Sequence, residues 1–250
     1  MSVTAVIGSR GRMGAMLMER LEAAGRTARG ADLPLTPDVL AAACAGADVA
    51  LLCVPAAVLG DVAHLVAPHL ETGAVLADIA SVKMLPMRAM RKAYAGPVVG
   101  THPLFGPKPR PDYNAVCVTP DEGTDEAAVR AVEEVFEGMG CTTFRSTPEV
   151  HDRAMAVVQG LNFITSVAYF AMLSQRNDVL PFLTPSLQRR TEAARSMLTS
   201  DAALFTGIFE TNPMSQDVVR EYRSYLNLAA GGDVDMLAAL AGRWFEERDG

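Results

Sequence analysis

The stretch Val3-Thr4-Ala5-Val6-Ile7-Gly8-Ser9-Arg10-Gly11-Arg12-Met13-Gly14 decides the fold of this 250-residue chain. Its first part is an apolar, β-rich run that is typical of a buried strand. A helical pattern begins at about Arg12, continues to Ala24 and ends at Gly25. Glycine lets the backbone turn sharply between two such elements. The chain is therefore predicted to open with a strand, a glycine turn and a helix.

The glycine turn is a near match to the loops that bind dinucleotides. The strict pattern G-x-G-x-x-G requires a glycine where Ser9 stands, although Gly8 precedes it. In such loops the backbone approaches a pyrophosphate, and the amides at the helix N-terminus hold its charge. An ordinary strand-to-helix turn is the alternative. We predict that the turn binds a cofactor through Gly8, Ser9, Arg10, Gly11, Arg12, Met13 and Gly14.

A carboxylate follows at the separation expected for a ribose contact. Asp32 lies 18 residues after Gly14, at the end of the presumed second strand. A carboxylate there accepts hydrogen bonds from the adenosine ribose and repels a 2′-phosphate. Asp32 therefore predicts NAD rather than NADP, although the arginines nearby in the sequence favour a phosphate. The alternative is that Asp32 is a solvated loop carboxylate without a role in binding. Val54 and Pro55, at the end of a later strand, are expected to line the nicotinamide side.

Further apolar runs alternate with helical segments, which indicates βαβ units and a mainly parallel sheet. These runs are Asp48–Pro55, Ala74–Ile79, Val98–Gly100, Ala115–Thr119 and Cys141–Arg145. From about Ser146 to Gly250 the periodicity is helical, with no convincing strand. We therefore predict an α/β Rossmann-like dinucleotide-binding domain over residues 1–146. An all-α domain is predicted over residues 147–250.

Composition narrows the class of protein. The net charge of −7 disfavours nucleic-acid binding, which needs concentrated Lys and Arg. The four cysteines form no C-x-x-C pair, so we expect reduced core residues and no metal site. The first residues carry no basic leader, which predicts a cytoplasmic protein without a signal peptide. The uncharged stretch from Ala154 to Leu173 is long enough to span a bilayer, but polar residues interrupt it. We expect it to be buried in a core or a subunit interface, not in a membrane.

One histidine stands where open α/β sheets bind their ligands. His102 follows the apolar run Pro97–Gly100, in a segment stiffened by Pro and Gly, and we expect it in a loop at the strand end. Histidine suits proton transfer near neutral pH, so His102 is predicted to be catalytic, with a structural histidine as the alternative. Ser81 follows the preceding strand and is expected to hydrogen-bond either His102 or the substrate. Lys83 is expected to face an anion or solvent.

Four segments together resemble the prephenate/arogenate dehydrogenase family of tyrosine biosynthesis. They are Gly8–Gly14, Ala77–Lys83 (Ala-Asp-Ile-Ala-Ser-Val-Lys), Gly100–Pro107 (Gly-Thr-His-Pro-Leu-Phe-Gly-Pro) and Glu149–Ala156 (Glu-Val-His-Asp-Arg-Ala-Met-Ala). The resemblance implies NAD(P)-dependent oxidative decarboxylation of prephenate to 4-hydroxyphenylpyruvate, or of arogenate to tyrosine. It also implies a homodimer formed through the helical domain. His102 would be the catalytic histidine and Ser81 its neighbour.

The resemblance also implies an arginine in the helical domain that holds a substrate carboxylate. Arg195 is our placement, with Arg190 and Arg189 as rivals. Many members of the family carry a Ser-His-Leu-Pro-His-type segment, and residues 159–163 here are Gln-Gly-Leu-Asn-Phe. Because that histidine is missing, Gln159 and Asn162 become candidate substrate contacts. We expect His151 to begin a helix at the domain junction, which leaves His102 as the site's only imidazole.

Two other classes of protein compete with this interpretation. β-Hydroxyacid dehydrogenases place a catalytic lysine in the second domain, and no lysine occurs between Ser146 and Gly250. A non-catalytic nucleotide-sensing protein on the same scaffold is the other alternative. His102 and Ser81 argue against it, whereas the altered segment at 159–163 argues for it.

Overall fold

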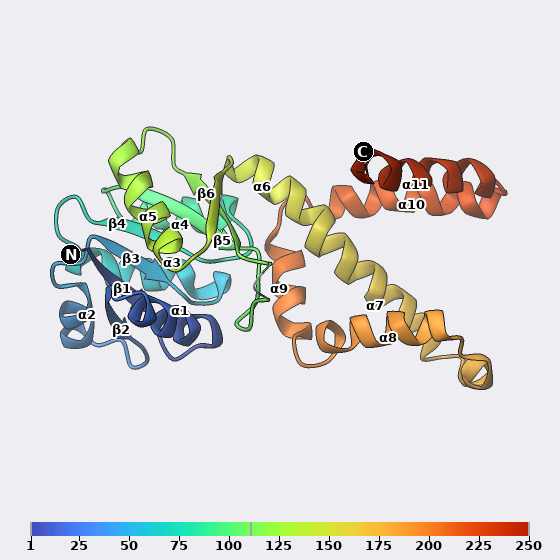
Figure 1. Cartoon of the computed structure of the whole chain (residues 1–250), viewed down its shortest axis with the longest axis horizontal. Coiled ribbons are helices and arrows are strands. Elements are labelled where there is room, and N and C mark those ends of the chain that lie inside the picture. The colour runs from blue at the N-terminus through green and yellow to red at the C-terminus, as the bar shows by residue number, and fades with distance from the viewer. Residues whose placement is uncertain (1, 111, 250) are drawn as a thin grey trace. The chain divides into compact units, whose positions relative to one another are not determined.

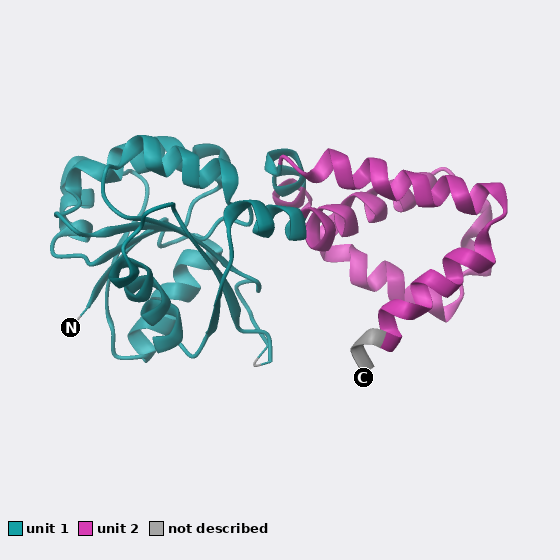
Figure 2. Ribbon diagram, turned by 90° about the horizontal axis from the view of Figure 1, so that it is seen from above, with its two compact units in different colours: residues 1–155, 206–212 teal, residues 156–205, 213–250 magenta. Residues whose placement is uncertain are grey.

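The computed structural model describes residues 2–110 and 112–249, and the chain divides into two compact units (Figures 1 and 2). The first unit contains Met1–Met155 and Thr206–Asn212, and the second contains Ala156–Phe205 and Pro213–Gly250. We expected a boundary after residue 146, but helix α6 (Pro148–Met155) belongs to the first unit. The reason is that α6 buries polar side chains in the first unit, as described below.

The first unit is built on a seven-stranded sheet with the order β2-β1-β3-β4-β5-β6-β7. Its strands are β1 (Val3–Ile7), β2 (Thr27–Ala31), β3 (Val49–Leu52), β4 (Val75–Asp78), β5 (Val98–Pro103), β6 (Ala115–Pro120) and β7 (Thr142–Arg145). All neighbours pair in parallel except β5 and β6, which are antiparallel. This Rossmann-like sheet confirms the predicted fold class.

Helices cover both faces of this sheet (Figure 1). They are α1 (Arg12–Ala23), α2 (Pro37–Cys44), α3 (Ala56–Val66), α4 (Met84–Ala93) and α5 (Glu126–Gly138), with a 3-10 turn, η1 (Ala67–His69). Along β1, Val6 packs into a core with α1 and α5, whereas Ile7 packs into the opposite core with α2, α3 and α4. Because successive residues of a strand point to opposite faces, a sheet covered on both faces needs continuous apolar runs.

The second unit is helical in the residues that the structure describes. It contains a π-helical segment η2 (Ala156–Leu161), α7 (Asn162–Leu173), a 3-10 segment η3 (Asn177–Phe182), α8 (Pro185–Leu198), α10 (Ser215–Gly231) and α11 (Val234–Asp249). Helix α9 (Ala202–Thr211) begins in this unit and ends in the first. Gly232, with a φ of 100°, ends α10 in the left-handed conformation that favours glycine.

The long helix Pro148–Leu173 is apolar enough, by length and composition, to cross a membrane. Only 22 % of its most apolar window is buried within the chain. Large apolar side chains are also exposed on α10 and α11. They include Tyr225 (45 %), Leu226 (51 %), Val234 (56 %), Met236 (47 %), Trp244 (62 %) and Phe245 (65 %). Apolar surface of this extent is typical of an interaction surface.

Candidate active site

The segments predicted to bind ligand leave the sheet at one edge. Ile7 pairs with both Ala31 and Leu52. Leu52 in turn pairs with Asp78, which pairs with Gly100. The residues that follow these positions therefore emerge together at the carboxyl ends of the parallel strands. That edge is where open α/β sheets bind their ligands.

The glycine turn has the close backbone packing that its sequence predicts. Gly8 has a φ of 91°, and a Cβ atom at Gly14 would lie 2.1 Å from the Gly8 carbonyl oxygen. Gly11 precedes the first residue of α1 as its N-cap. Ser9, which replaces a glycine of the strict pattern, packs against another glycine, because a Cβ at Gly30 would meet Ser9 Oγ at 2.7 Å. The loop thus accommodates its departure from the pattern.

Asp32 directly follows β2 and faces the glycine turn. Its Oδ2 accepts a hydrogen bond of 2.7 Å from the Arg10 backbone N–H, and its Oδ1 accepts one from Leu33. Asp32 is half-buried, so it is more constrained than a solvated loop carboxylate. Of the other residues predicted at the cofactor, Arg12 and Pro55 are exposed and Met13 and Val54 are half-buried. All of them lie on the segments that leave the same sheet edge.

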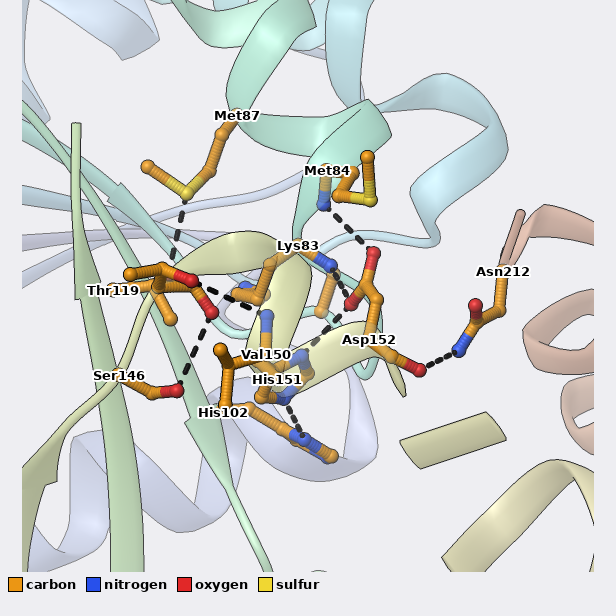
Figure 3. Close-up of polar contacts among 12 residues, drawn as sticks. Lys83, Met84, Met87, His102, Thr119, Ser146, Val150, His151, Asp152 and Asn212 are labelled. Atoms are coloured by element: carbon orange, nitrogen blue, oxygen red, sulfur yellow. Dashed lines mark hydrogen bonds and ion pairs between the residues drawn. The ribbon is translucent and has the colours of Figure 1, made fainter. Parts of the chain in front are cut away.

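His102 lies within β5 rather than in the loop that we expected. The antiparallel partner β6 extends β5 beyond its pairing with β4, and His102 pairs with Cys117. The residue is 3 % exposed. Its Nδ1 lies 3.0 Å from Nε2 of His151, with the two rings edge to face (Figure 3). The expectation of a single imidazole in the site is therefore wrong.

Asp152 is hydrogen-bonded to His151 through the ring nitrogen that does not face His102. His151 Nδ1 lies 2.8 Å from Asp152 Oδ1, and both residues are buried. The Asp152 carboxylate also accepts the backbone N–H groups of Lys83 at 2.7 Å and Met84 at 2.9 Å, at the start of α4 (Figure 3). The Asn212 side chain donates to the Asp152 carbonyl oxygen at 2.7 Å. These bonds explain why α6 and Thr206–Asn212 join the first unit.

Lys83 faces an anion, one of the two alternatives that we expected, and that anion is the buried carboxylate of Asp78. Its Nζ is fully buried and donates to Asp78 Oδ1 at 2.8 Å, to Asp78 Oδ2 at 2.6 Å and to the Thr101 carbonyl oxygen at 2.5 Å. These three acceptors match the three N–H bonds of an ammonium group. Burial raises the pKa of Asp78 and lowers the pKa of Lys83, and the ion pair opposes both shifts.

The surroundings of His102 keep its ring neutral. Burial in the protein is the main cause that lowers the pKa of His102 well below its ordinary value, and the neighbouring His151 and the Lys83 cation lower it further. Ser81 is half-buried in the loop between β4 and α4. Among the residues that the structure describes, the His102 ring is hydrogen-bonded to His151 and not to Ser81.

The residues predicted to bind substrate lie on several helices of the second unit. Gln159 is in the π-helical segment η2, and its Oε1 is buried with no hydrogen-bond partner among the described residues. Short π-helical segments occur often at functional sites. Asn162 begins α7 and is exposed. The three arginines lie on α8, and Arg190 stacks on Tyr169 with Cζ 3.8 Å from the ring centroid. Arg189 and Arg195 are exposed.

Comparison with known proteins gives the family. The profile described as "Prephenate dehydrogenase, nucleotide-binding domain" matches residues 20–144, which is half of the chain. The chain belongs to the prephenate dehydrogenase family. Its first unit is accordingly the nucleotide-binding domain of that family.

Relatives that match between 51 % and 87 % of the chain carry related names. A "T-protein" of Enterobacter agglomerans is 26 % identical over 87 % of this chain and 58 % of its own length. A "Probable arogenate/prephenate dehydrogenase" of Methanocaldococcus jannaschii is 28 % identical over 68 % of this chain and 40 % of its own. A "4-amino-4-deoxyprephenate dehydrogenase" of Streptomyces pristinaespiralis is 35 % identical over 51 % of this chain and 43 % of its own. The chain thus spans about half the length of the relatives it matches.

Solved structures share the fold of this family member. Prephenate dehydrogenase from A. aeolicus, in complex with hydroxyphenyl propionate and NAD⁺, has a TM-score of 0.81 at 19 % identity, and the match covers 99 % of this chain and 97 % of that one. Synechocystis arogenate dehydrogenase has a TM-score of 0.80 at 21 % identity, with 100 % and 99 % covered. The fold of both units is therefore that of dehydrogenases in this family.

The buried polar network behind His102 was not predicted from the sequence. Lys83 was expected to face an anion or solvent, with no partner named, and His151 was expected at a domain junction. Their partners Asp78 and Asp152 lie 5 and 1 residues away along the chain. Neither pair points to His102 by spacing alone. The one available signal was that the segments Ala77–Lys83 and Glu149–Ala156 both carry the family resemblance.

Proposed function

We propose that the protein is a prephenate dehydrogenase, which uses NAD to oxidise and decarboxylate prephenate to 4-hydroxyphenylpyruvate. The observation that carries the proposal is a neutral, buried His102 at the ligand edge of a nucleotide-binding sheet, linked through His151 to Asp152. Membership of the family supports the same reaction. We place the enzyme in the cytoplasm.

The residues suit the two demands of this chemistry. NAD, when bound, supplies the acceptor for the hydride that leaves the ring carbon bearing the hydroxyl group. The proton of that hydroxyl must be accepted as the carbonyl develops, and neutral His102 can accept it. Loss of CO₂ then makes the ring aromatic, so the substrate supplies most of the driving force. The chain mainly orients the reactants, and Ser81 is proposed to lie beside the imidazole of His102 in the site.

The glycine turn fits a dinucleotide. Its backbone packs so closely at Gly8 and Gly14 that no side chain fits at Gly14, and α1 begins directly after it. The amides at this helix N-terminus suit a pyrophosphate. Asp32, at the end of β2, suits the adenosine ribose and disfavours a 2′-phosphate. We therefore propose NAD rather than NADP as the cofactor.

The second unit is proposed to supply the substrate carboxylate contact and the dimer interface. Arg190 and Arg195 are both exposed, but the Arg190 guanidinium already stacks on the Tyr169 ring, which favours Arg195 as the carboxylate ligand. Gln159 and Asn162 remain candidate polar contacts. The apolar side chains of α10 and α11 and the uncharged helix are proposed to be buried in a homodimer.

The alternative to prephenate is a substrate that carries an amine, either on the side chain, as in arogenate, or on the ring. Residues 159–163 lack the histidine that many family members use for the keto-acid side chain, which favours arogenate. The relative named 4-amino-4-deoxyprephenate dehydrogenase is 35 % identical, against 26 % and 28 % for the other two. That name indicates a ring amine in place of the hydroxyl. A neutral imidazole can accept a hydrogen bond from either group.

The test is NADH formation with prephenate, arogenate and 4-amino-4-deoxyprephenate in parallel, each with NAD and with NADP. We expect prephenate with NAD to give the highest kcat/KM. His102→Asn should lower kcat by about 10²–10⁴-fold while the Kd for NAD stays within a factor of about two. Preference for an amine substrate would replace the proposed substrate, and full activity of His102→Asn would exclude its catalytic role. Light scattering that shows a monomer would exclude the proposed dimer.

A further inference from the structure

Three buried side chains form a single row of hydrogen bonds that ends at His102. Asp152 Oδ1 lies 2.8 Å from His151 Nδ1, and His151 Nε2 lies 3.0 Å from His102 Nδ1. Asp152 is fully buried, and each histidine is 3 % exposed. The row joins α6 to β5, although the two histidines lie 49 residues apart. Figure 3 shows the rings directed toward one another.

The donors around Asp152 determine where the protons in this row lie. Its Oδ1 accepts the Lys83 backbone N–H, and its Oδ2 accepts that of Met84. A backbone N–H can only donate, so both carboxylate oxygens act as acceptors. Two backbone donors favour the ionised, acceptor-only carboxylate, and the His151 nitrogen that faces it, Nδ1, then carries the proton of their hydrogen bond. In a neutral ring the opposite nitrogen, Nε2, is an acceptor.

We propose that His151 and Asp152 set the tautomer of His102, with the proton on Nδ1 and the lone pair on Nε2. Because Nε2 of His151 is an acceptor, Nδ1 of His102 must donate to it. The remaining nitrogen of His102 is then the base. In this role His151 and Asp152 act through His102 and are therefore positioning residues.

The catalytic consequence of this tautomer rests on the proposed function, the oxidation of prephenate. The O–H bond of the substrate breaks, an Nε2–H bond forms on His102, and the hydride electrons leave with the ring hydrogen to NAD. The imidazolium that results keeps its Nδ1–H bond to His151. Through that ring its charge is stabilised by the Asp152 carboxylate, as in other acid–histidine arrangements. The opposite tautomer would present an N–H to the substrate hydroxyl and could not accept its proton.

Other ionisable groups near His102 do not supply the negative charge that would stabilise its imidazolium form. The Lys83 ammonium is paired with Asp78 and disfavours a positive charge on His102. Cys117 lies opposite His102 on β6, and burial raises the pKa of its thiol to about 11. Asp152 is thus the anion that the row of hydrogen bonds connects to His102.

The direct test is the tautomer itself. Long-range ¹H–¹⁵N spectra of the ¹⁵N-histidine-labelled full chain distinguish protonated from unprotonated ring nitrogens, and the chain has only four histidines. The His102→Asn and His151→Gln variants assign the two signals. We expect the Nδ1–H form for both His102 and His151 near pH 7.5. An Nε2–H form of His102 would overturn the proposal.

Kinetics of paired variants test the consequence. His151→Leu removes the acceptor, and we expect kcat to fall by about 10²-fold or more, with the Kd for NAD unchanged. His151→Gln places an amide oxygen near the lost Nε2 and should recover kcat to within about tenfold of wild type. His64→Gln, at an exposed histidine bonded to the Gly60 carbonyl of its own helix, is the matched control. Equal kcat in the Leu and Gln variants would overturn the positioning role.

The two measurements separate this proposal from the proposed function. The spectrum does not depend on turnover, so the expected tautomer without oxidation of prephenate would refute the proposed function alone. Turnover of prephenate with the Nε2–H tautomer of His102 would refute the present proposal alone.

Discussion

Lys83→Met removes a buried cation without removing much volume. The Lys83 ammonium and the Asp78 carboxylate are both 0 % exposed and lie 2.6 Å apart. In the variant Asp78 keeps the Ala80 backbone N–H as a donor, but it loses both bonds from Nζ. The Thr101 carbonyl oxygen, one residue before His102, loses its donor as well. The substitution therefore leaves in the core a carboxyl without its cation and a carbonyl without the Nζ donor.

The expected loss is about 3–5 kcal/mol of unfolding free energy at pH 7, the typical cost of removing one partner of a buried ion pair. Urea unfolding followed by circular dichroism should show a midpoint lower by about 2 M, if the slope is about 2 kcal/mol/M. Burial raises the pKa of Asp78, and the variant lacks the cation that opposes this rise. When the pKa of a carboxyl is higher in the folded than in the unfolded protein, the free energy of unfolding falls as pH rises above the unfolded-state pKa of about 3.9. The difference in unfolding free energy between wild type and Lys83→Met should therefore be smaller at pH 5 than at pH 8.

A double variant separates charge from packing. Asp78→Asn combined with Lys83→Met removes both charges and should recover more than half of the lost stability, because an uncompensated charge causes most of the cost. The reasoning would be refuted if Lys83→Met lay within about 1 kcal/mol of wild type. It would also be refuted if the double variant were no more stable than Lys83→Met.

Four other substitutions test three separate parts of the molecule. Gly14→Ala places a Cβ 2.1 Å from a carbonyl oxygen of the same loop, so titration should show NAD affinity reduced by about tenfold or more. The hydrogen bond from Arg145 keeps the pKa of Glu133 below its ordinary value, so this stabilisation is present above about pH 4.3 and is lost as pH falls further. Glu133→Gln should therefore be less stable at pH 7 by about 1–3 kcal/mol and should vary less with acid pH in urea titrations. Arg195→Ala should raise the KM for prephenate by about tenfold or more, and Arg190→Ala by less, because the Arg190 guanidinium stacks on a ring. A larger effect of Arg190→Ala in steady-state assays would reverse that assignment.

Much of the fold was predictable because its signals are local. The apolar runs and the glycine turn at Gly8–Gly14 predict strands, a tight turn and a helix from periodicity alone. The change to helical periodicity near Ser146 likewise predicted a helical second part. The unit boundary was not predictable, because α6 is joined to the first unit through Asp152 and Asn212, which lie 60 residues apart.

The candidate site was predictable only in part. His102 could be placed at the ligand edge, because carboxyl ends of parallel strands meet there. Its position inside β5 depended on antiparallel pairing with β6, which extends the strand. For Lys83 the sequence left an anion and solvent open, and only the contact with Asp78 in the folded chain identifies the anion and makes the burial of a lysine possible.

By itself the sequence determined the order of strands and helices, the glycine turn and the residue types at the ligand edge. It did so because turn geometry and burial on both faces of a sheet constrain neighbouring residues. Tertiary structure alone decided that Asp152 meets His151, and that His151 meets His102 across 49 residues. Hydrogen-bond direction depends on which donors and acceptors meet after packing. The protonation pattern of His102 is therefore a property of the folded network and not of any segment.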